Sequence, residues 1–319
     1  MFRVLDLGPD GVATVREGDV FVGPPPQGTV RWIDLVEPDP ASLARLKERF
    51  DFHQLALENC ATYGLVSKLD DFERYLFVVV HGFTADPADP LAIQIHELHA
   101  FLGDSYLVTV HDNPLAATQQ VWDDAARDRE LLARGPLWIL YLQIHGLVEA
   151  TEPLVDRITE DLDGIERQVI EEGGAIDLSP VFKAKRTATA MRRVIRPLRD
   201  TLVNLHRRVD RKTRGANHLR DVADHVIRIA ERVEEAREVS FGVINAYQAL
   251  QANKTNEVVK KLTVFSAVFL PLGFIVGFWG QNFADLPFDS PFWFGVMLVS
   301  LVVVPAGLLE WFKRNLFRP

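Results

Sequence analysis

The hydrophobic and polar positions in the first third of the chain predict short strands mixed with brief helices. Apolar runs bounded by Pro, Gly and Asp predict strands at residues 29–35, 74–83, 91–101 and 105–112. Asp39 and Pro40 predict the N-cap and the first helical position of a helix over 39–50. We therefore expect an α/β domain over residues 1–114.

The strand pattern ends near residue 115, and only helical patterns follow it. We expect cytoplasmic helices over residues 115–214. Within that range the helical patterns cover 115–172, with Gly135-Pro136 as a candidate break, and 180–212, with Ser179 as N-cap and Pro180 at the first helical position.

A much longer helical pattern begins near residue 217. No proline stands between Pro197 and Pro271, and a helix over 217–280 would be about 95 Å long at 1.5 Å per residue. This length exceeds what a globular domain needs. The pattern predicts a stalk helix over 215–261 that continues without a break into an apolar run.

Two runs near the C-terminus, Leu262–Gly280 and Phe292–Leu309, contain no Lys, Arg, Asp or Glu. Each has the length of a helix that crosses a hydrocarbon layer of about 30 Å. We therefore predict transmembrane helices at 262–282 and 292–312, an external loop at 283–291 and a basic cytoplasmic tail at 313–319.

The charges beside these runs predict their orientation. Basic residues flank the outer ends of the pair, namely Lys260, Lys261, Lys313, Arg314 and Arg318, whereas the connecting loop has only Asp285 and Asp289. Positive charge marks the cytoplasmic side, so both termini are expected in the cytoplasm of a multi-pass cell-membrane protein. The first residues lack the basic and apolar regions of a signal peptide.

Composition narrows the function classes further. The net charge of −9 argues against nucleic acid as a partner and favours cations. The single cysteine, Cys60, cannot form an internal disulfide. The sequence shows no Gly-rich phosphate loop, nucleophile motif or paired-carboxylate site, so we expect neither an enzyme nor an ATP-driven pump, and no cofactor.

One face of the predicted long helix carries small and polar residues. Hydroxyls and carboxamides are costly against lipid, so this face should meet protein or water. Two interpretations remain: close packing of two helices, or a pore around which several copies gather. The stripe reads Asn245, Ala249, Ala252, Asn256, Val259, Thr263, Ser266, Leu270, Gly273, Gly277 and Gly280.

Carboxamides at both ends of the apolar run favour the pore. Asn256 precedes the run and Asn282 follows it. Amide oxygens can bind the water shell of Mg²⁺, a cation that loses its water reluctantly. Gly280 would let backbone carbonyls approach the axis, and Val259, Leu262 and Leu270 are candidates for apolar constrictions.

The segment NKTNEVVKKLTVFSAVFLPLGFIVGFWGQNF (253–283) closely resembles the CorA family of divalent-cation channels, the two-helix GxN proteins. Residues 220–239, 196–202 and 68–86 are similar to the same family. The resemblance implies a homopentameric funnel in membrane lipid, with the long helix lining the pore and the second span outside it. It also implies passive transport of Mg²⁺, with Co²⁺ or Ni²⁺ as further substrates, closed by intracellular cation.

The resemblance assigns roles to individual residues. Gly280 and Asn282 match the signature, with Gln281 between them, and Asn256 matches an asparagine that contacts hydrated ion. Asp221 matches an acidic residue at subunit interfaces where bound cation keeps the channel closed. Val259, Leu262 and Leu270 match apolar gate positions. The remaining expected pore-lining residues are Asn245, Thr263, Ser266, Gly273 and Gly277.

The sequence departs from the family pattern at positions that bear on ion preference. Trp279-Gly280-Gln281-Asn282 replaces the usual Tyr-Gly-Met-Asn, Ala284 replaces a common acidic residue, and Asn245 stands where the magnesium channels often have aspartate. Two alternatives therefore stay open: a zinc transporter of the same fold, and a membrane-anchored sensor or scaffold that does not conduct.

Two other patterns have plainer interpretations. His96 and His99 of HELH, with His81 and His111, suggest a zinc site, but residues three apart on a strand point to opposite faces, so we favour structural roles. A basic block over 183–214 follows acidic residues in the helix before it. We expect these two segments to pair antiparallel and to neutralise each other; the acids are Glu160, Asp161, Asp163, Glu166, Glu171 and Glu172.

Overall fold

The computed structural model describes residues 2–18, 22–86, 89–172, 176–210, 213–281 and 290–315. The chain divides into two compact units, Met1–Ile244 and Asn245–Pro319. The first unit holds the strands together with most of the helices, and the second holds the end of the longest helix and the last helix.

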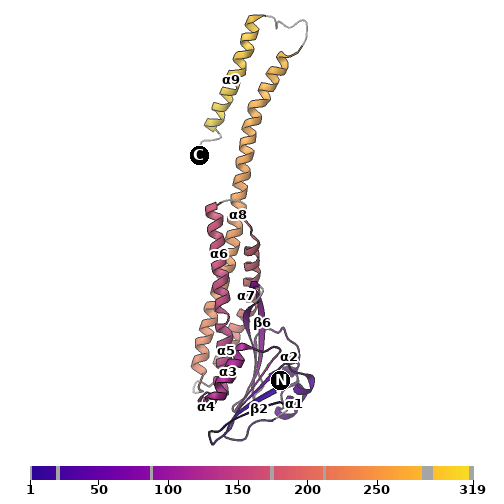
Figure 1. The fold of residues 1–319 in the computed structure, drawn as a ribbon, viewed down its shortest axis with the longest axis vertical. Helices are drawn as coiled ribbons and strands as arrows, with labels where there is room; N and C mark the ends of the chain where they lie inside the picture. Colours follow the sequence, from indigo (N-terminus) through magenta and orange to yellow (C-terminus); the bar gives the residue numbers. More distant parts are fainter. Residues whose placement is uncertain are drawn as a thin grey trace. The chain divides into compact units, whose positions relative to one another are not determined.

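A seven-stranded sheet forms the centre of the first unit, in the order β2-β1-β3-β7-β6-β5-β4 (Figure 1). Neighbouring strands are antiparallel except β3 and β7, which pair in parallel. The strands are β1 (Phe2–Leu7), β2 (Ala13–Glu17), β3 (Val30–Val36), β4 (Lys68–Asp71), β5 (Leu76–Asp86), β6 (Asp89–Leu102) and β7 (Tyr106–His111).

Helices α1 (Pro40–Phe50) and α2 (Gln54–Ala61) cover one face of this sheet. Leu46 and Leu57 share one buried cluster with Ile33 of β3. Asp39 caps α1, because its carboxylate accepts a hydrogen bond of 2.7 Å from the backbone N–H of Ser42. The predicted helix and its cap are therefore confirmed.

The other face of the sheet carries helices from later in the chain. Side chains alternate along a strand, so Trp32, next to Ile33, points the other way and lies 5.0 Å from the ring of Trp122. Gly82 of β5 lets a helix approach closely, because a Cβ there would come within 2.8 Å of the Leu147 side chain. These helices are α3 (Ala116–Arg127), α4 (Arg129–Ala133) and α5 (Pro136–Glu149).

The predicted helix over 115–172 is interrupted at three places, and α6 (Glu152–Glu172) is its last part. Gly135 adopts a φ of 98°, which a residue with a side chain rarely adopts, so the expected break at Gly135-Pro136 is present. Asp128 begins α4 by accepting a 2.9 Å hydrogen bond from the N–H of Glu130. The sequence analysis missed that break.

The predicted cap of α7 (Ser179–Arg208) was wrong. Ser179 is the first helical residue, and its N–H donates to the carboxylate of Asp177 at 2.9 Å. The hydrogen bond of the Ser179 hydroxyl, and then that of its N–H, lower the pKa of Asp177. An aspartate two residues earlier thus provides the oxygen that a capping serine would have supplied.

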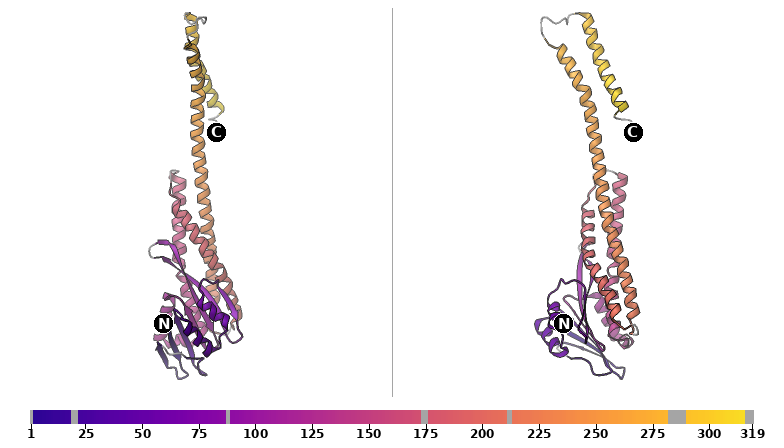
Figure 2. Two further views of the ribbon diagram at one scale, coloured as in Figure 1. Left: turned by 90° about the vertical axis from the view of Figure 1, so that its right-hand side faces the viewer. Right: turned by 180° about the vertical axis from the view of Figure 1, so that it is seen from behind.

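The longest helix, α8 (Ala216–Trp279), has 64 residues, which corresponds to about 96 Å at 1.5 Å per residue. The predicted continuous rod is confirmed, and Figure 2 shows it without a break. The last helix, α9 (Pro291–Asn315), contains the second apolar run.

A buried ionic network fixes the middle of the sheet. Asp34 is fully buried and meets the guanidinium of Arg3 at 2.8 Å and His111 Nε2 at 3.1 Å, and it accepts a hydrogen bond from Thr109. Burial alone would raise the pKa of Asp34, but the hydrogen bond and charge of His111, the charge of Arg3 and the Thr109 hydroxyl outweigh it, so the pKa is lowered. The network joins β1, β3 and β7.

Candidate functional site

The stripe of small and polar residues lies along one side of α8. Its steps alternate between four and three residues, from Asn245 to Gly280, which gives a mean spacing of about 3.5 residues. This is the spacing that keeps one seam of a helix on the axis of a left-handed bundle. The stripe therefore has the repeat expected of a helix that packs among parallel copies.

The three candidate gate residues, of which Val259 and Leu270 belong to the stripe and Leu262 precedes its Thr263, are all exposed. Val259 is 53% exposed, Leu262 62% and Leu270 73%. Within the described parts of the chain they are not packed as the large aliphatic side chains of the sheet and its helices are. An exposed apolar surface of this kind in a membrane span is expected to contact lipid or another chain.

A shallow groove of about 600 Å³ runs along the middle of this face. Ser266, Leu270 and Gly273 line it at helical spacing, and large rings stand beside them. The ring of Phe265 stacks on that of Phe269 with centroids 4.2 Å apart. The site is thus a narrow strip of small side chains between walls of phenylalanine.

The helix backbone determines which polar atoms along the strip remain available as hydrogen-bond acceptors. The Thr263 hydroxyl donates to the carbonyl of Val259 at 2.8 Å, so its oxygen remains available as an acceptor. Pro271 has no N–H, and the carbonyl of Ala267, four residues earlier, therefore lacks its helical donor. The sequence analysis missed Ala267, although the position of Pro271 was the signal that identifies it.

The last hydrogen-bonded turn of α8 includes Gly280, which directly follows the helix. The N–H of Gly280 donates to the carbonyl of Val276 at 3.0 Å, and a Cβ at Gly280 would lie 3.2 Å from the same oxygen. A side chain there would disturb the last turn. Gln281 is exposed, whereas Asn282 lies outside the described residues.

Aromatic rings join the two helices of the second unit at this end. The rings of Trp279 on α8 and Trp293 on α9 lie 6.1 Å apart. Tryptophan is enriched where a transmembrane helix reaches the water interface. The contact therefore supports an interface position for the ends of both helices.

The candidate polar residues of the cytoplasmic part of α8 are all exposed. Asn245 and Asn256 present their carboxamides to solvent. Asp221 lies near the start of α8, close to Tyr141 of α5. Burial raises the pKa of Tyr141, and the negative charges of Asp221 and Glu149 raise it further.

Both apolar runs have the properties of membrane spans. Each lies in a helix long and apolar enough to cross a bilayer, and neither run is buried inside the chain. A core helix of a soluble protein would be mostly buried, and a signal sequence would lie near the N-terminus. These two helices, which end at Trp279 and Asn315, fit neither description.

The four histidines considered for zinc are held by hydrogen bonds within the sheet. His81 Nδ1 lies 2.7 Å from the Ser67 hydroxyl, and His96 Nε2 lies 2.7 Å from that of Thr84. His99 bonds to Glu97, and His111 bonds to Asp34. Among the described residues, no group of three His, Cys, Asp or Glu side chains could hold a metal ion.

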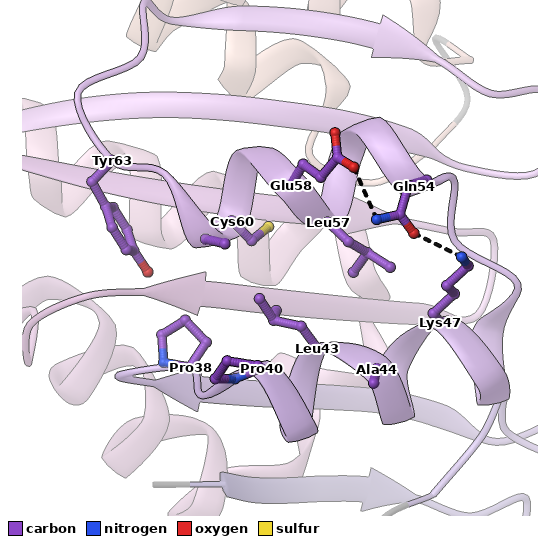
Figure 3. A pocket seen from close by; sticks show the side chains of 11 residues that line it. Pro38, Pro40, Leu43, Ala44, Lys47, Gln54, Leu57, Glu58, Cys60 and Tyr63 are labelled. Atoms are coloured by element: carbon purple, nitrogen blue, oxygen red, sulfur yellow. Dashed lines mark hydrogen bonds between the residues drawn. The ribbon is translucent and has the colours of Figure 1, made fainter.

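A groove of about 510 Å³ between α1 and α2 is a second candidate site (Figure 3). On its rim Gln54 accepts from Lys47 at 2.7 Å and donates to Glu58 at 3.0 Å. Cys60 is buried, and burial raises the pKa of its thiol. The thiol is therefore not a nucleophile.

The basic block pairs with different residues from those expected. Arg192 and Arg196 of α7 meet Glu234 of α8 at 2.8 and 3.8 Å, and Arg208 meets Asp71 of β4 at 3.1 Å. The expected pairing with the acids of α6 is therefore wrong for these arginines. The ion pairs of α7 stabilise its contacts with α8 and the sheet.

Comparison with known proteins identifies the family. The family described as CorA-like Mg2+ transporter protein matches residues 27–314. The cobalt/magnesium transport protein CorA of Thermotoga maritima is 31% identical over 284 residues, covering 85% of this chain and 78% of that protein. The YfjQ protein of Bacillus subtilis is 28% identical over 289 residues, covering 89% and 88%.

The fold agrees over nearly the whole chain. The complete structure of the CorA magnesium transporter from Methanocaldococcus jannaschii has a TM-score of 0.79 at 16% identity, covering 98% of both chains. The N-terminal α/β unit, the long helix and the second apolar helix all have counterparts in that structure. The family of membrane transporters and the two C-terminal spans fit a two-span membrane protein with a cytoplasmic N-terminal unit. The chain therefore belongs to the CorA-like Mg2+ transporter family, as the NKTNE segment and the Gly-x-Asn signature predicted, and it transports divalent cations.

Proposed function

We propose that the chain assembles as a homopentamer around the stripe of α8 and forms a passive channel for divalent cations, with Mg²⁺ as the main substrate. The observation that carries this proposal is the small and polar face that runs through an otherwise apolar and exposed span. One helix cannot enclose a channel, so the stripe needs neighbouring copies. The magnesium and cobalt named for the relative from Thermotoga maritima support these two ions as substrates.

The recognition step uses oxygen atoms that contact the water shell of the ion. Asn282 and the backbone around Gly280 stand at the outer mouth, and Asn256 stands at the inner one. Amide oxygens accept hydrogen bonds from the ion's water, so Mg²⁺ need not lose its tightly held shell. No catalytic step is needed for this function, and we assign none.

The gate is apolar. Rings of Val259, Leu262 and Leu270 offer no polar group that could replace water, so a narrow pore at these levels dewets and stops ions. Asp221 regulates the gate, since intracellular cation bound near this carboxylate holds neighbouring copies in the closed arrangement. Regulation and transport then use different residues of one helix.

Cation flux into liposomes tests the proposal. Purified protein, with its oligomeric mass measured, is reconstituted in vesicles with an inside-negative potential, and uptake of Mg²⁺, Co²⁺, Ni²⁺ and Zn²⁺ is followed with dyes. We expect Mg²⁺ uptake, and Asn282→Ala should abolish its selectivity while the pentamer persists. Uptake by Asn282→Ala at the parental rate and selectivity would refute the filter, and Zn²⁺ uptake alone would favour a zinc transporter.

A further inference from the structure

Different sides of α8 contact α6 and α7, and these two helices also contact each other. His225 and Arg232 of α8 pair with Glu152 and Asp156 of α6, the first pair at 2.7 Å. Glu234, two residues after Arg232, pairs instead with α7. Residues two apart point about 200° apart around a helix. Figure 1 shows the same arrangement within the first unit, with α6 and α7 beside α8.

The exposed side of α6 is acidic. Glu160, Asp163 and Glu166 are exposed, and within the described part of the chain their carboxylates form no ion pair or hydrogen bond. Ile170 continues the same stripe and is 69% exposed. At 100° per residue the four side chains fall within an arc of about 120°. We call this set the acidic stripe.

The exposed side of α7 is basic. Arg186 and Arg193 are exposed and form no ion pair in the region that the structure describes. They border a shallow groove of about 520 Å³ whose floor includes the small side chains of Thr189 and Ala190. Phe182 lies at one end and is 46% exposed. We call this set the basic groove.

We propose that the acidic stripe of one copy docks into the basic groove of the next copy around the ring. This inference rests on the proposed oligomer. A contact between two different faces of identical chains is head-to-tail, and such contacts close into rings. The groove's small floor and exposed phenylalanine suit Ile170, and its arginines suit the carboxylates.

The positions of the charges agree with this contact. Asp156 meets α8 at Arg232, and α6 runs in the same direction as α8, so Glu160 lies near the level of residue 234. Arg192 and Arg196 also meet Glu234, which puts Arg193 near that level.

The second charge pair follows from helix geometry. Along the direction in which α6 and α8 run, Glu166 lies about 9 Å further than Glu160. Because α7 runs in the opposite direction, Arg186 lies about 10 Å further than Arg193 along that same direction. A rotation about an axis parallel to these helices relates neighbouring copies and leaves the height of each residue along that axis unchanged. Glu160 therefore lies at the height of Arg193 of the neighbouring copy, and Glu166 at the height of Arg186, and the proposed contact pairs them.

Disulfide cross-linking between two differently tagged full-length chains tests the contact. One chain carries Glu166→Cys and the other Arg186→Cys, so a disulfide within one chain cannot form between these positions. Cys60 stays in place, because it is buried and burial raises its pKa. We expect mixed dimers on oxidation of the co-expressed chains and none with either chain alone.

A matched control replaces Glu166→Cys by Gln168→Cys, which is exposed but points about 200° away from Glu166. We expect the mixed dimer to fall at least fivefold in this control. In a second pair, Glu160→Cys and Arg193→Cys, adding Arg186→Glu should lower the yield, and adding Glu166→Lys to Arg186→Glu should restore it.

Each other outcome overturns the inference. If mixed dimers are no more abundant than in the control while the oligomer and its cation flux persist, the interface is wrong and the proposed function stands. A monomeric protein refutes both. Protection of Arg186→Cys from maleimide by phosphatidylglycerol vesicles, with no cross-link to Glu166→Cys, would show that the groove binds lipid instead.

Discussion

Replacing Asp34 by asparagine should strongly destabilise the cytoplasmic unit without altering the proposed pore. Asp34 is fully buried and is the acceptor for Arg3, which is 5% exposed, and for Thr109 and His111. The amide keeps the shape of the side chain but removes its charge, which leaves the guanidinium of Arg3 buried without its counter-ion. Breaking one side of a buried ion pair costs about 3–5 kcal/mol.

Tryptophan fluorescence can follow this loss. The indole of Trp32 donates to Thr109 at 3.0 Å, and the guanidinium of Arg3 lies 4.2 Å from the ring of Trp122, so both rings report on the network. At about 2–4 °C per kcal/mol, the midpoint of thermal unfolding should fall by roughly 6–20 °C in Asp34→Asn.

Asp51→Asn is the matched control. Asp51 pairs with Arg74 at 3.4 Å on the surface and has a φ of 55°, which asparagine also accepts. An exposed pair of this kind contributes about 0–1 kcal/mol, so the midpoint should hardly move. If Asp34→Asn unfolds within 2 °C of the parent, the network does not stabilise the sheet as argued.

The pH dependence gives a second measure of the same carboxylate. The pKa of Asp34 is lowered in the folded chain, so its contribution to stability is present above the unfolded pKa of about 3.9 and is lost as pH falls through the folded value. The stability gap between parent and Asp34→Asn should therefore narrow below about pH 4. A gap that widens there would contradict the sign.

Three further predictions concern the long helix. Leu262→Asn should wet the gate and leak cations at saturating Mg²⁺, measured as vesicle flux on a confirmed pentamer; misassembly without leak would favour a plain packing face. Asp221→Asn should raise the Mg²⁺ concentration that closes the channel, read from flux titrations, and an unchanged value would remove it from the regulatory site. Gly280→Ala should reduce flux, because its Cβ would lie 3.2 Å from the Val276 carbonyl, and parental flux would show that the turn tolerates it.

The sequence predicted the elements whose pattern is local. The charge-free runs, the proline-free helix and the cap at Asp39 each depend on neighbours within a few residues, and the structure places them as expected. The sequence analysis missed strand β1. All six of its residues are buried, so a continuous apolar run would have marked it, but Arg3 and Asp6 interrupt that run. Arg3 is neutralised by Asp34, 31 positions away, and Asp6 by Arg16 and Arg31, 10 and 25 positions away.

In the candidate site, too, local features were predicted from the sequence and long-range pairings were not. Spacing alone revealed the stripe of α8, whereas the partners of the basic block needed the fold. Arg192 reaches Glu234 across 42 positions of sequence, and the acids just before the block, which lie nearer along the chain, are not its partners. A run of like charges in the sequence therefore predicts that a segment forms ion pairs, but it does not identify the partner residues.

The stripe residues of α8 are spaced alternately three and four apart, and this spacing determines how the stripe is oriented along the helix. An ordinary α-helix turns through 3.6 residues, so a stripe that repeats every 3.5 drifts by about 20° per heptad when the helix is straight. From Asn245 to Gly280 there are five heptads, and the drift sums to about 100°. The stripe can face one axis along its whole length only if α8 coils. In the proposed channel, straightening the coil would turn Gly280 away from the axis while Asn245 still faced it. A change of twist alone, with no break in the helix, would then exchange the small residues at one mouth for the bulky ones beside them.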